Sequence, residues 1–90
     1  MISATIVKTY HNYTIEQYTY SADVSATGKP LTMYEVYDND THELIAAYRN
    51  LWEAVYKVKQ KLVIAGKIEN FFLPERGARQ FLIDTMDRIA

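Results

Sequence analysis

The chain contains no cysteine, and this absence excludes a whole group of chemistries. It rules out a disulfide framework, a thiolate metal site and a cysteine nucleophile. A secreted domain of only 90 residues would often need such a cross-link, so the composition favours a reducing compartment.

Long apolar runs are also missing. The longest clearly aliphatic stretch is Leu62-Val63-Ile64-Ala65, far short of the roughly 20 residues that a spanning helix needs. The first residues have no basic region followed by an apolar core, so we predict no signal peptide. We therefore expect no membrane association and a cytoplasmic location.

Charge of one sign is lacking as well. Ten Lys and Arg stand against eleven Asp and Glu, which gives a net charge of -1 and argues against a dedicated nucleic-acid binder. Four lysines do gather at the end of the first predicted helix: Lys57, Lys59, Lys61 and Lys67. Lys57 and Lys61 share one side of that helix, and Lys59 points elsewhere. Cations near the end of a helix are stabilised by the helix dipole, so these lysines need no ligand to explain them. A sheet with exposed aromatics can still stack on single-stranded bases, so a nucleic-acid-binding accessory domain is the alternative function.

What is present fits a single globular domain. Apolar residue types make up 49% of the chain and charged types 23%, and neither value fits a disordered or membrane protein. The length leaves no room for a second core, so residues 1–90 are predicted to form one domain.

The first half of the chain has the composition of a sheet. Tyr, Thr, Ile and Val are frequent there, and turn-forming clusters separate four predicted strands at about 2–10, 13–20, 32–38 and 43–48. We expect hairpin turns at His11-Asn12, with Asn12 able to adopt the left-handed conformation, and at residues 38–42. Residues 21–30 form the longest predicted loop.

The second half has helical periodicity. Asn50 and Glu53 resemble a capping box, in which each side chain bonds an amide at the helix start, and Gly66 offers a left-handed stop. The core stripe of this first helix comprises Leu51, Ala54, Val55, Val58, Leu62 and Ala65.

A second helix is predicted from about 75 to 89, with Pro74 near its first turn. Its apolar stripe comprises Ala78, Phe81, Leu82, Met86 and Ile89. Its other side carries two acid-first pairs at i, i+4, namely Glu75 with Arg79 and Asp84 with Arg88.

Strands followed by helices predict an α+β two-layer sandwich in the order ββββαα, with a four-stranded antiparallel sheet and two helices on one face. A meander is the default strand order, because sequential strands usually pair. The other face of the sheet is then left open.

No pattern in the chain declares a catalytic chemistry. His11 and His42 fall in predicted turns, with no serine elbow and no second histidine at i+4. Residues 38–43 resemble the start of a calcium loop, but Glu43 stands where glycine is needed and Arg49 where a bidentate acid is needed. No nucleotide-binding glycine motif is present. We therefore predict no enzyme activity, no catalytic residues, no metal and no cofactor.

Tyrosine is the most informative residue, with eight in the chain and seven of them in the predicted sheet half. If Tyr13 and Ile15 face the helices, the alternation of strand side chains exposes one set of residues as the candidate protein-binding site: Glu16, Tyr18, Tyr20, Glu35 and Tyr37. Tyrosine is enriched in protein interfaces and their hot spots. It also has high strand propensity, so the rings can equally cover a half-solvated sheet with no partner.

Two further apolar features have alternative uses. Trp52, Tyr56 and Val63 form a second ridge on the first helix, which packs either on the last helix or against a partner, including a second copy in a homodimer. Residues 71–74 (Phe-Phe-Leu-Pro) either plug the core or form an exposed anchor.

The function favoured by the sequence is a small non-catalytic protein-protein interaction or regulatory module, with an unidentified protein partner. Glu16 and Glu35 would pair with basic groups, while the tyrosines become desolvated anchors. In size, cysteine-free composition and architecture the chain is similar to phage and mobile-element accessory proteins, including anti-CRISPR proteins. That similarity implies inhibition of a larger host machine by occupation of its surface.

Overall fold

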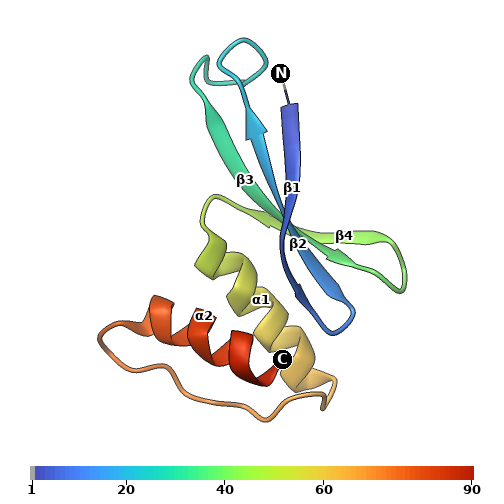
Figure 1. Cartoon of the computed structure of the whole chain (residues 1–90), viewed down its shortest axis with the longest axis vertical. Helices are drawn as coiled ribbons and strands as arrows, with labels where there is room; N and C mark the ends of the chain where they lie inside the picture. The colour runs from blue at the N-terminus through green and yellow to red at the C-terminus, as the bar shows by residue number, and fades with distance from the viewer. Residues whose placement is uncertain (1) are drawn as a thin grey trace.

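The chain forms a four-stranded antiparallel sheet followed by two helices, as a computed structural model that describes residues 2–90 shows. The strands pair in sequence order as a meander, and the bounds of all elements are β1 Ile2–Tyr10, β2 Tyr13–Tyr20, β3 Leu31–Asp38, β4 Glu43–Tyr48, α1 Leu51–Ile64 and α2 Ala78–Ile89. The predicted α+β class and ββββαα order are confirmed (Figure 1). The strand bounds match the prediction except that β3 begins one residue earlier, at Leu31.

The register of the central strands fixes which side chains face the helices. Ile15 of β2 lies opposite Val36 of β3, and both are fully buried in the core with residues of α1 and α2. Because alternate side chains of a strand point to opposite faces, Glu16 and Glu35, which are also paired, lie on the face turned away from the helices.

Helix α1 buries the middle of the predicted stripe, whereas Leu51 is only partly buried and Ala65 follows the helix and is exposed. Ala54, Val55, Val58 and Leu62 are all fully buried. The start of the helix differs from the predicted capping box, because the Asn50 side-chain amide donates to the Glu53 carboxylate at 2.8 Å and neither side chain caps a backbone amide. Within residues 2–90, neither helix is long and apolar enough to cross a bilayer.

Helix α2 begins later than predicted. Gly77 takes the left-handed conformation (φ 68°) and the helix starts at Ala78, so Pro74 lies outside it. Gly77 allows this entry because it has no Cβ to clash at positive φ.

The two predicted i, i+4 ion pairs of α2 are absent from the described residues. The Arg79 guanidinium lies 4.6 Å from the centre of the Trp52 ring instead, and Asp84 accepts a hydrogen bond from the Gln80 side chain at 2.8 Å. Glu75 precedes the helix, so the helical spacing on which its pairing depended does not exist.

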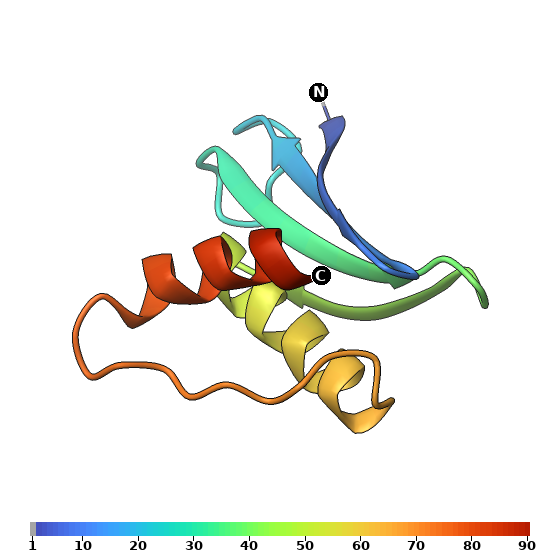
Figure 2. The ribbon, with the colours of Figure 1, turned by 60° about the horizontal axis from the view of Figure 1, so that its bottom comes forward.

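The connection between the helices runs back along the helical layer, so that α1 and α2 point in a similar direction (Figures 1 and 2). Its side chains alternate in burial, as expected of an extended segment. Phe71 and Leu73 pack against the core, whereas Phe72 between them is almost fully exposed. Phe71 and Leu73 therefore plug the core as one prediction has it, while a role of the exposed Phe72 as an anchor stays a prediction.

The helices cover only part of the sheet. β1, β2 and β3 extend well beyond the helical layer in one direction (Figure 1), and the molecule measures 43 × 34 × 17 Å. The core takes from the sheet only residues near the covered end, such as Tyr10, Tyr13 and Val36. We call the uncovered part, residues 2–6, 16–20 and 31–33, the protruding half.

The hairpin turns lie at the predicted places, but the conformation of the first differs from the prediction. His11 has the positive φ (53°) that was expected of Asn12, and His42 has a φ of 60° in the second turn. Asn12 instead uses its carbonyl oxygen to accept a hydrogen bond from the Asn39 backbone amide at 2.7 Å. This bond joins the two turns at the same end of the sheet.

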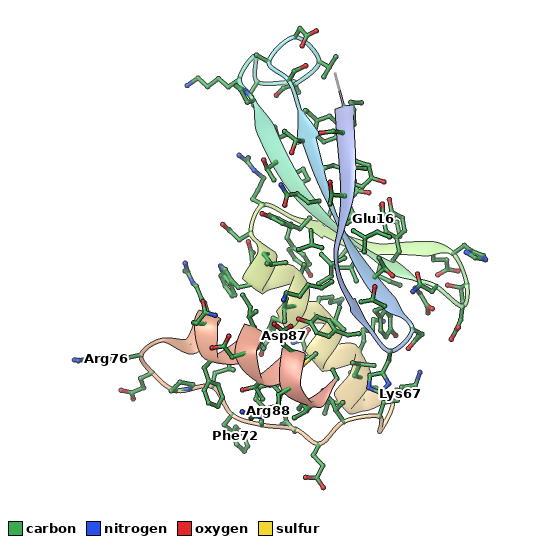
Figure 3. All side chains as sticks on the ribbon, viewed as in Figure 1. Glu16, Lys67, Phe72, Arg76, Asp87 and Arg88 are labelled. Carbon is green, nitrogen blue, oxygen red and sulfur yellow. The ribbon has the colours of Figure 1, made fainter. Side chains whose placement is uncertain are left out.

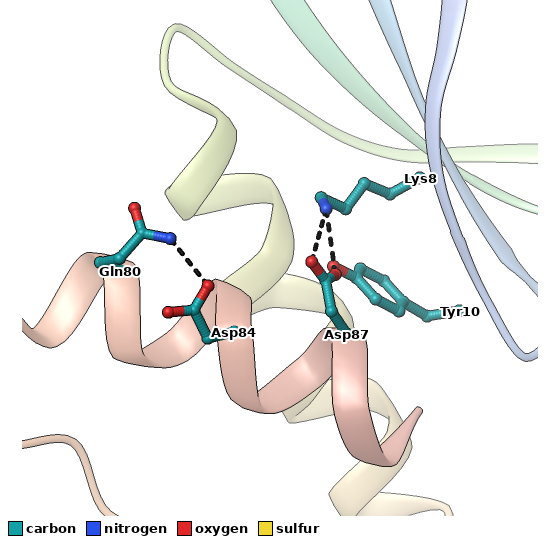
Figure 4. A network of polar contacts seen from close by, with 5 residues as sticks. All are labelled: Lys8, Tyr10, Gln80, Asp84 and Asp87. Carbon is teal, nitrogen blue, oxygen red and sulfur yellow. Dashed lines mark hydrogen bonds and ion pairs between the residues drawn. The ribbon is translucent and has the colours of Figure 1, made fainter.

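A polar network ties α2 to the first strand (Figure 4). The Tyr10 hydroxyl donates to Asp87 at 2.5 Å, and the Lys8 ammonium donates to both carboxylate oxygens of Asp87 at 3.0 and 2.8 Å. Burial by itself raises the pKa of the Asp87 carboxyl, but the hydrogen bonds from Lys8 and Tyr10, with the charge of Lys8, outweigh it and hold that pKa below its usual value.

Removal of this carboxylate should weaken the docking of α2. We expect Asp87→Ala to lower the free energy of unfolding by about 1 to 2 kcal/mol at pH 7, because the buried Tyr10 hydroxyl loses its acceptor. A carboxyl whose folded pKa is depressed stabilises the fold above its unfolded pKa, and this contribution is lost as the pH falls through the folded pKa. Urea unfolding of both chains at pH 7 and at about pH 2 measures the difference, which should shrink in acid.

Tyr10→Phe is the matched control for this prediction. If the hydroxyl matters only through Asp87, the double variant should lose less stability than the sum of the two single variants. Strict additivity of the two effects would contradict the proposed coupling.

Candidate functional site: the open face of the sheet

The structure brings the five predicted binding residues together on one face. Glu16, Tyr18 and Tyr20 alternate along β2, and Glu35 and Tyr37 alternate along the neighbouring β3. None of the five belongs to the core, and each is partly exposed. Figure 3 shows Glu16 on the sheet, clear of both helices. We call this surface the open face.

Two carboxylates stand side by side at its centre. Glu16 and Glu35 are directly opposite each other in the β2–β3 pairing. Like charges in this position repel each other, at a cost of some tenths of a kcal/mol to about 1 kcal/mol. Each carboxylate receives a hydrogen bond from the tyrosine two residues further along its own strand, from Tyr18 to Glu16 at 2.7 Å and from Tyr37 to Glu35 at 2.5 Å.

The two tyrosines approach the carboxylates from opposite sides. Tyr18 lies on β2 towards the protruding end, and Tyr37 lies on β3 towards the covered end. The hydrogen bond to Glu16 raises the pKa of Tyr18, and the hydrogen bond to Glu35 strongly raises the pKa of Tyr37. The two phenols are also close enough to influence each other's pKa. Both hydroxyls thus stay protonated as donors and hold the carboxylates in place.

Tyr20 extends the aromatic surface outwards. Its ring stacks on that of Tyr18, with 6.4 Å between the ring centres and 23° between the planes. Such offset pairs are favourable beyond their buried area. The two rings form a continuous aromatic surface on the protruding half.

Apolar side chains from the other strands surround the carboxylates. Pairing places the following residues on the open face: Ile2, Ala4, Ile6, Leu31, Met33 and Leu44. Ile2, Ile6 and Leu44 are each more than half exposed. The sequence prediction did not include the residues of β1 and β4, because their faces depend on pairing irregularities that pattern does not reveal, between Ile6 and Lys8 and between Val36 and Tyr37.

The reverse side of the protruding half differs from the open face in the polarity of its side chains. It carries uncharged polar side chains: Ser3, Thr5, Gln17, Thr19 and Thr32. Since the helices cover neither side of this region, strand propensity alone gives no reason to place the apolar residues on one side. The separation marks the open face as the surface suited to desolvation.

The carboxylates of the open face have no cationic partner in the described part of the chain. No lysine or arginine among residues 2–90 lies within ion-pair distance of Glu16 or Glu35. In the same range, no group of three or more His, Asp or Glu side chains is placed to hold a metal ion. The positive counterpart of the pair must come from solvent or from another molecule.

Neither histidine takes part in a constellation of reactive groups. His11 and His42 are exposed in the two hairpin turns. A cavity of about 600 Å³ lies elsewhere, beside α1, and neither histidine lines it. The expected absence of catalytic activity stays a prediction.

Fold and site together define a small α+β domain whose antiparallel sheet is partly uncovered on both sides and apolar on one of them. Comparison with protein-family models, with curated proteins and with solved structures finds no match. The functional inference therefore depends on the residues of this chain alone.

Proposed function

We propose that the chain is a non-catalytic protein-binding module that docks its partner on the open face of the sheet. The observation that carries the proposal is the separation of side chains on the protruding half, apolar and aromatic on one side and uncharged and polar on the other. An exposed apolar and aromatic surface gathered on one side is typical of the buried core of an interface, which supports a docking role for the open face.

The partner's chemistry follows from the centre of the face. Glu16 and Glu35 carry two negative charges in a ring of apolar and aromatic side chains. A lysine or arginine of the partner, itself surrounded by apolar residues, complements this arrangement. Binding would relieve the repulsion between the two carboxylates and desolvate Tyr18 and Tyr20, which are the rigid aromatic contacts typical of hot spots.

The same charges disfavour the alternative function. Nucleic-acid affinity comes mainly from cations that neutralise phosphates, and the centre of the open face is acidic. Inhibition of a larger host machine remains a prediction about which protein is bound, and the partner's identity will decide it.

The proposal is tested by capture followed by binding measurements on the purified pair. The immobilised chain retains a protein from the native host, mass spectrometry identifies it, and the dissociation constant is then measured by calorimetry. We expect the triple variant Tyr18→Ser, Tyr20→Ser, Tyr37→Ser to weaken binding by roughly 100-fold or more, since hot-spot tyrosines often contribute about 2 kcal/mol each. The double variant Glu16→Gln, Glu35→Gln should chiefly slow association and reduce its salt dependence.

The reverse side of the same strands provides the matched control. Gln17→Ser and Thr19→Ser change neighbouring residues of β2 on the polar side and should leave the affinity unchanged. Equal losses in both sets of variants, or loss of folding in the tyrosine variant by circular dichroism, would refute the assignment of the open face. A self-association seen by light scattering and abolished by the same tyrosine substitutions would make a second copy the partner.

A further inference from the structure

A groove separates α1 from the connection that follows it. Its volume is about 600 Å³, in the range of ligand-binding cavities, and it is open to solvent along one side. Tyr56, Val63 and Ile64 of α1 form one wall, and Phe71 and Phe72 of the connection form the other. The second ridge of α1 thus borders this groove through Tyr56 and Val63. Its third residue, Trp52, is covered from α2 by the Arg79 guanidinium.

Lys59 is the central polar group of the groove. Its residue is only 8% exposed, yet its ammonium pairs with no carboxylate among residues 2–90. The ammonium lies 4.7 Å from the centre of the Phe71 ring and 5.5 Å from that of Tyr56. Burial lowers the pKa of Lys59. The apolar stem of Lys59 is buried, its ammonium reaches the groove, and no group among residues 2–90 provides an anion for it.

The groove gathers more positive charge than the helical wheel predicted. Lys59 was expected to point away from Lys57 and Lys61, but all three border the groove. The reason is that the connection folds back over the side of α1 on which Lys59 lies, so the cavity wraps around the helix. No acidic residue lines the groove, so its charge is wholly positive.

Two large apolar side chains stand at the rim. Ile64 is 85% exposed and Phe72 is 87% exposed, which makes them the most exposed large apolar residues described. Figure 3 shows Phe72 on the outer side of the connection, pointing away from the core. A small ligand inside the groove would leave much of both side chains in water, whereas a peptide that crosses the groove would cover them.

We propose that this groove binds a peptide segment of a partner protein in which an acidic side chain is flanked by bulky apolar ones. The acidic side chain pairs with the Lys59 ammonium, and the apolar side chains cover Phe72 and Ile64. Lys57 and Lys61 lie nearer solvent and steer the approach of the segment. The groove belongs to the helical layer, while the open face lies on the far side of the sheet, so the chain would connect two different partners. This site is independent of the proposed function of the open face.

A display library of random twelve-residue peptides tests the proposal even while the partner is unidentified. The natural chain and the variant Lys59→Met are screened in parallel. We expect the natural chain alone to enrich sequences with Asp or Glu beside Leu, Ile, Phe or Trp. Enrichment of the same sequences by the variant, or no enrichment over it, would overturn the proposal.

The affinity of an enriched peptide is then measured by fluorescence anisotropy. Lys59→Met should weaken binding by roughly tenfold or more, and Phe72→Ala, which changes an exposed residue outside the core, by about threefold or more. Lys29→Met, an exposed lysine in the loop after β2, is the matched control for charge and should have no effect. Tyr18→Ser should also leave peptide affinity unchanged, which separates this site from the open face.

Other ligands are distinguished by the same assay. Decanoate carries a carboxylate on an apolar body, and a labelled oligothymidine carries phosphates. Lys59-dependent binding of either probe, in the absence of peptide binding, would overturn the proposal and assign the groove to a small carboxylate or to nucleic acid.

Discussion

Replacement of Leu82 with alanine should lower the free energy of unfolding by about 2 to 5 kcal/mol. Leu82 is fully buried in α2 and belongs to the hydrophobic core that the sheet and both helices share. A domain of this length has a free energy of unfolding on the order of 5 to 13 kcal/mol, so the loss is a large fraction of the total. The surrounding side chains come from a few short elements and cannot collapse fully into the cavity.

Urea or thermal unfolding followed by circular dichroism measures this effect. Leu44→Ala is the matched control, because it removes the same atoms from a side chain that is 53% exposed on the open face. It should cost less than about 1 kcal/mol, as surface substitutions generally do. Similar losses at the two positions would mean that the open face is part of the stabilising core and not a docking surface.

Replacement of Lys59 with methionine should have the opposite effect and raise the free energy of unfolding. Methionine keeps most of the apolar stem of lysine and removes an unpaired ammonium from a residue that is 8% exposed. The ammonium does gain favourable contacts with the rings of Phe71 and Tyr56. Burial lowers the pKa of Lys59, so desolvation disfavours the charged form in the folded chain. We expect a gain of roughly 0.5 to 2 kcal/mol, seen as a higher melting temperature.

The pH dependence of this gain provides its check. The folded pKa of Lys59 lies below the unfolded one, so the unfolded chain binds more protons between the two values and the stability of the natural chain rises with pH there. The advantage of Lys59→Met is therefore complete below the folded pKa and should narrow as the pH approaches about 10.4. The raised pKa values of Tyr10 and Tyr37 act equally in both chains and cancel in the difference. A variant less stable than the natural chain at pH 7 would show that the ammonium is a structural group.

The strands and the faces of the central strands could be predicted from the sequence because side chains alternate between the two faces of a strand. Once Ile15 is placed on the buried side, the positions of Glu16, Tyr18 and Tyr20 follow without further information. The same reasoning could not reach Ile6 or Leu44, because each lies beside an irregularity in pairing that shifts the alternation. The extent to which β1 to β3 project beyond the helices is likewise a tertiary property, set by where α1 and α2 pack.

The groove was missed for a related reason. Residues 65–77 have neither period two nor period 3.6, so nothing in the sequence places Phe71 opposite α1. One signal was nevertheless present. Lys59 lies four residues after Val55 and three before Leu62, both fully buried, which sets a lysine on the core stripe of α1. A lysine in that position buries its stem in the core and carries its ammonium to the groove, and this ammonium has no carboxylate partner within the described part of the chain.

The order of the elements along the chain also affects how the protein folds, both in isolation and during translation. Every strand pairs with its neighbour in sequence, so no long loop has to close before the hairpins form, and folding from a chain of such local contacts is expected to be fast. During translation, however, both hairpins leave the ribosome before α1 and α2, and isolated hairpins are marginal in water. Ile15 and Val36 therefore remain exposed to water until α1 and α2 have emerged, and the nascent strands are accessible to chaperones for that interval.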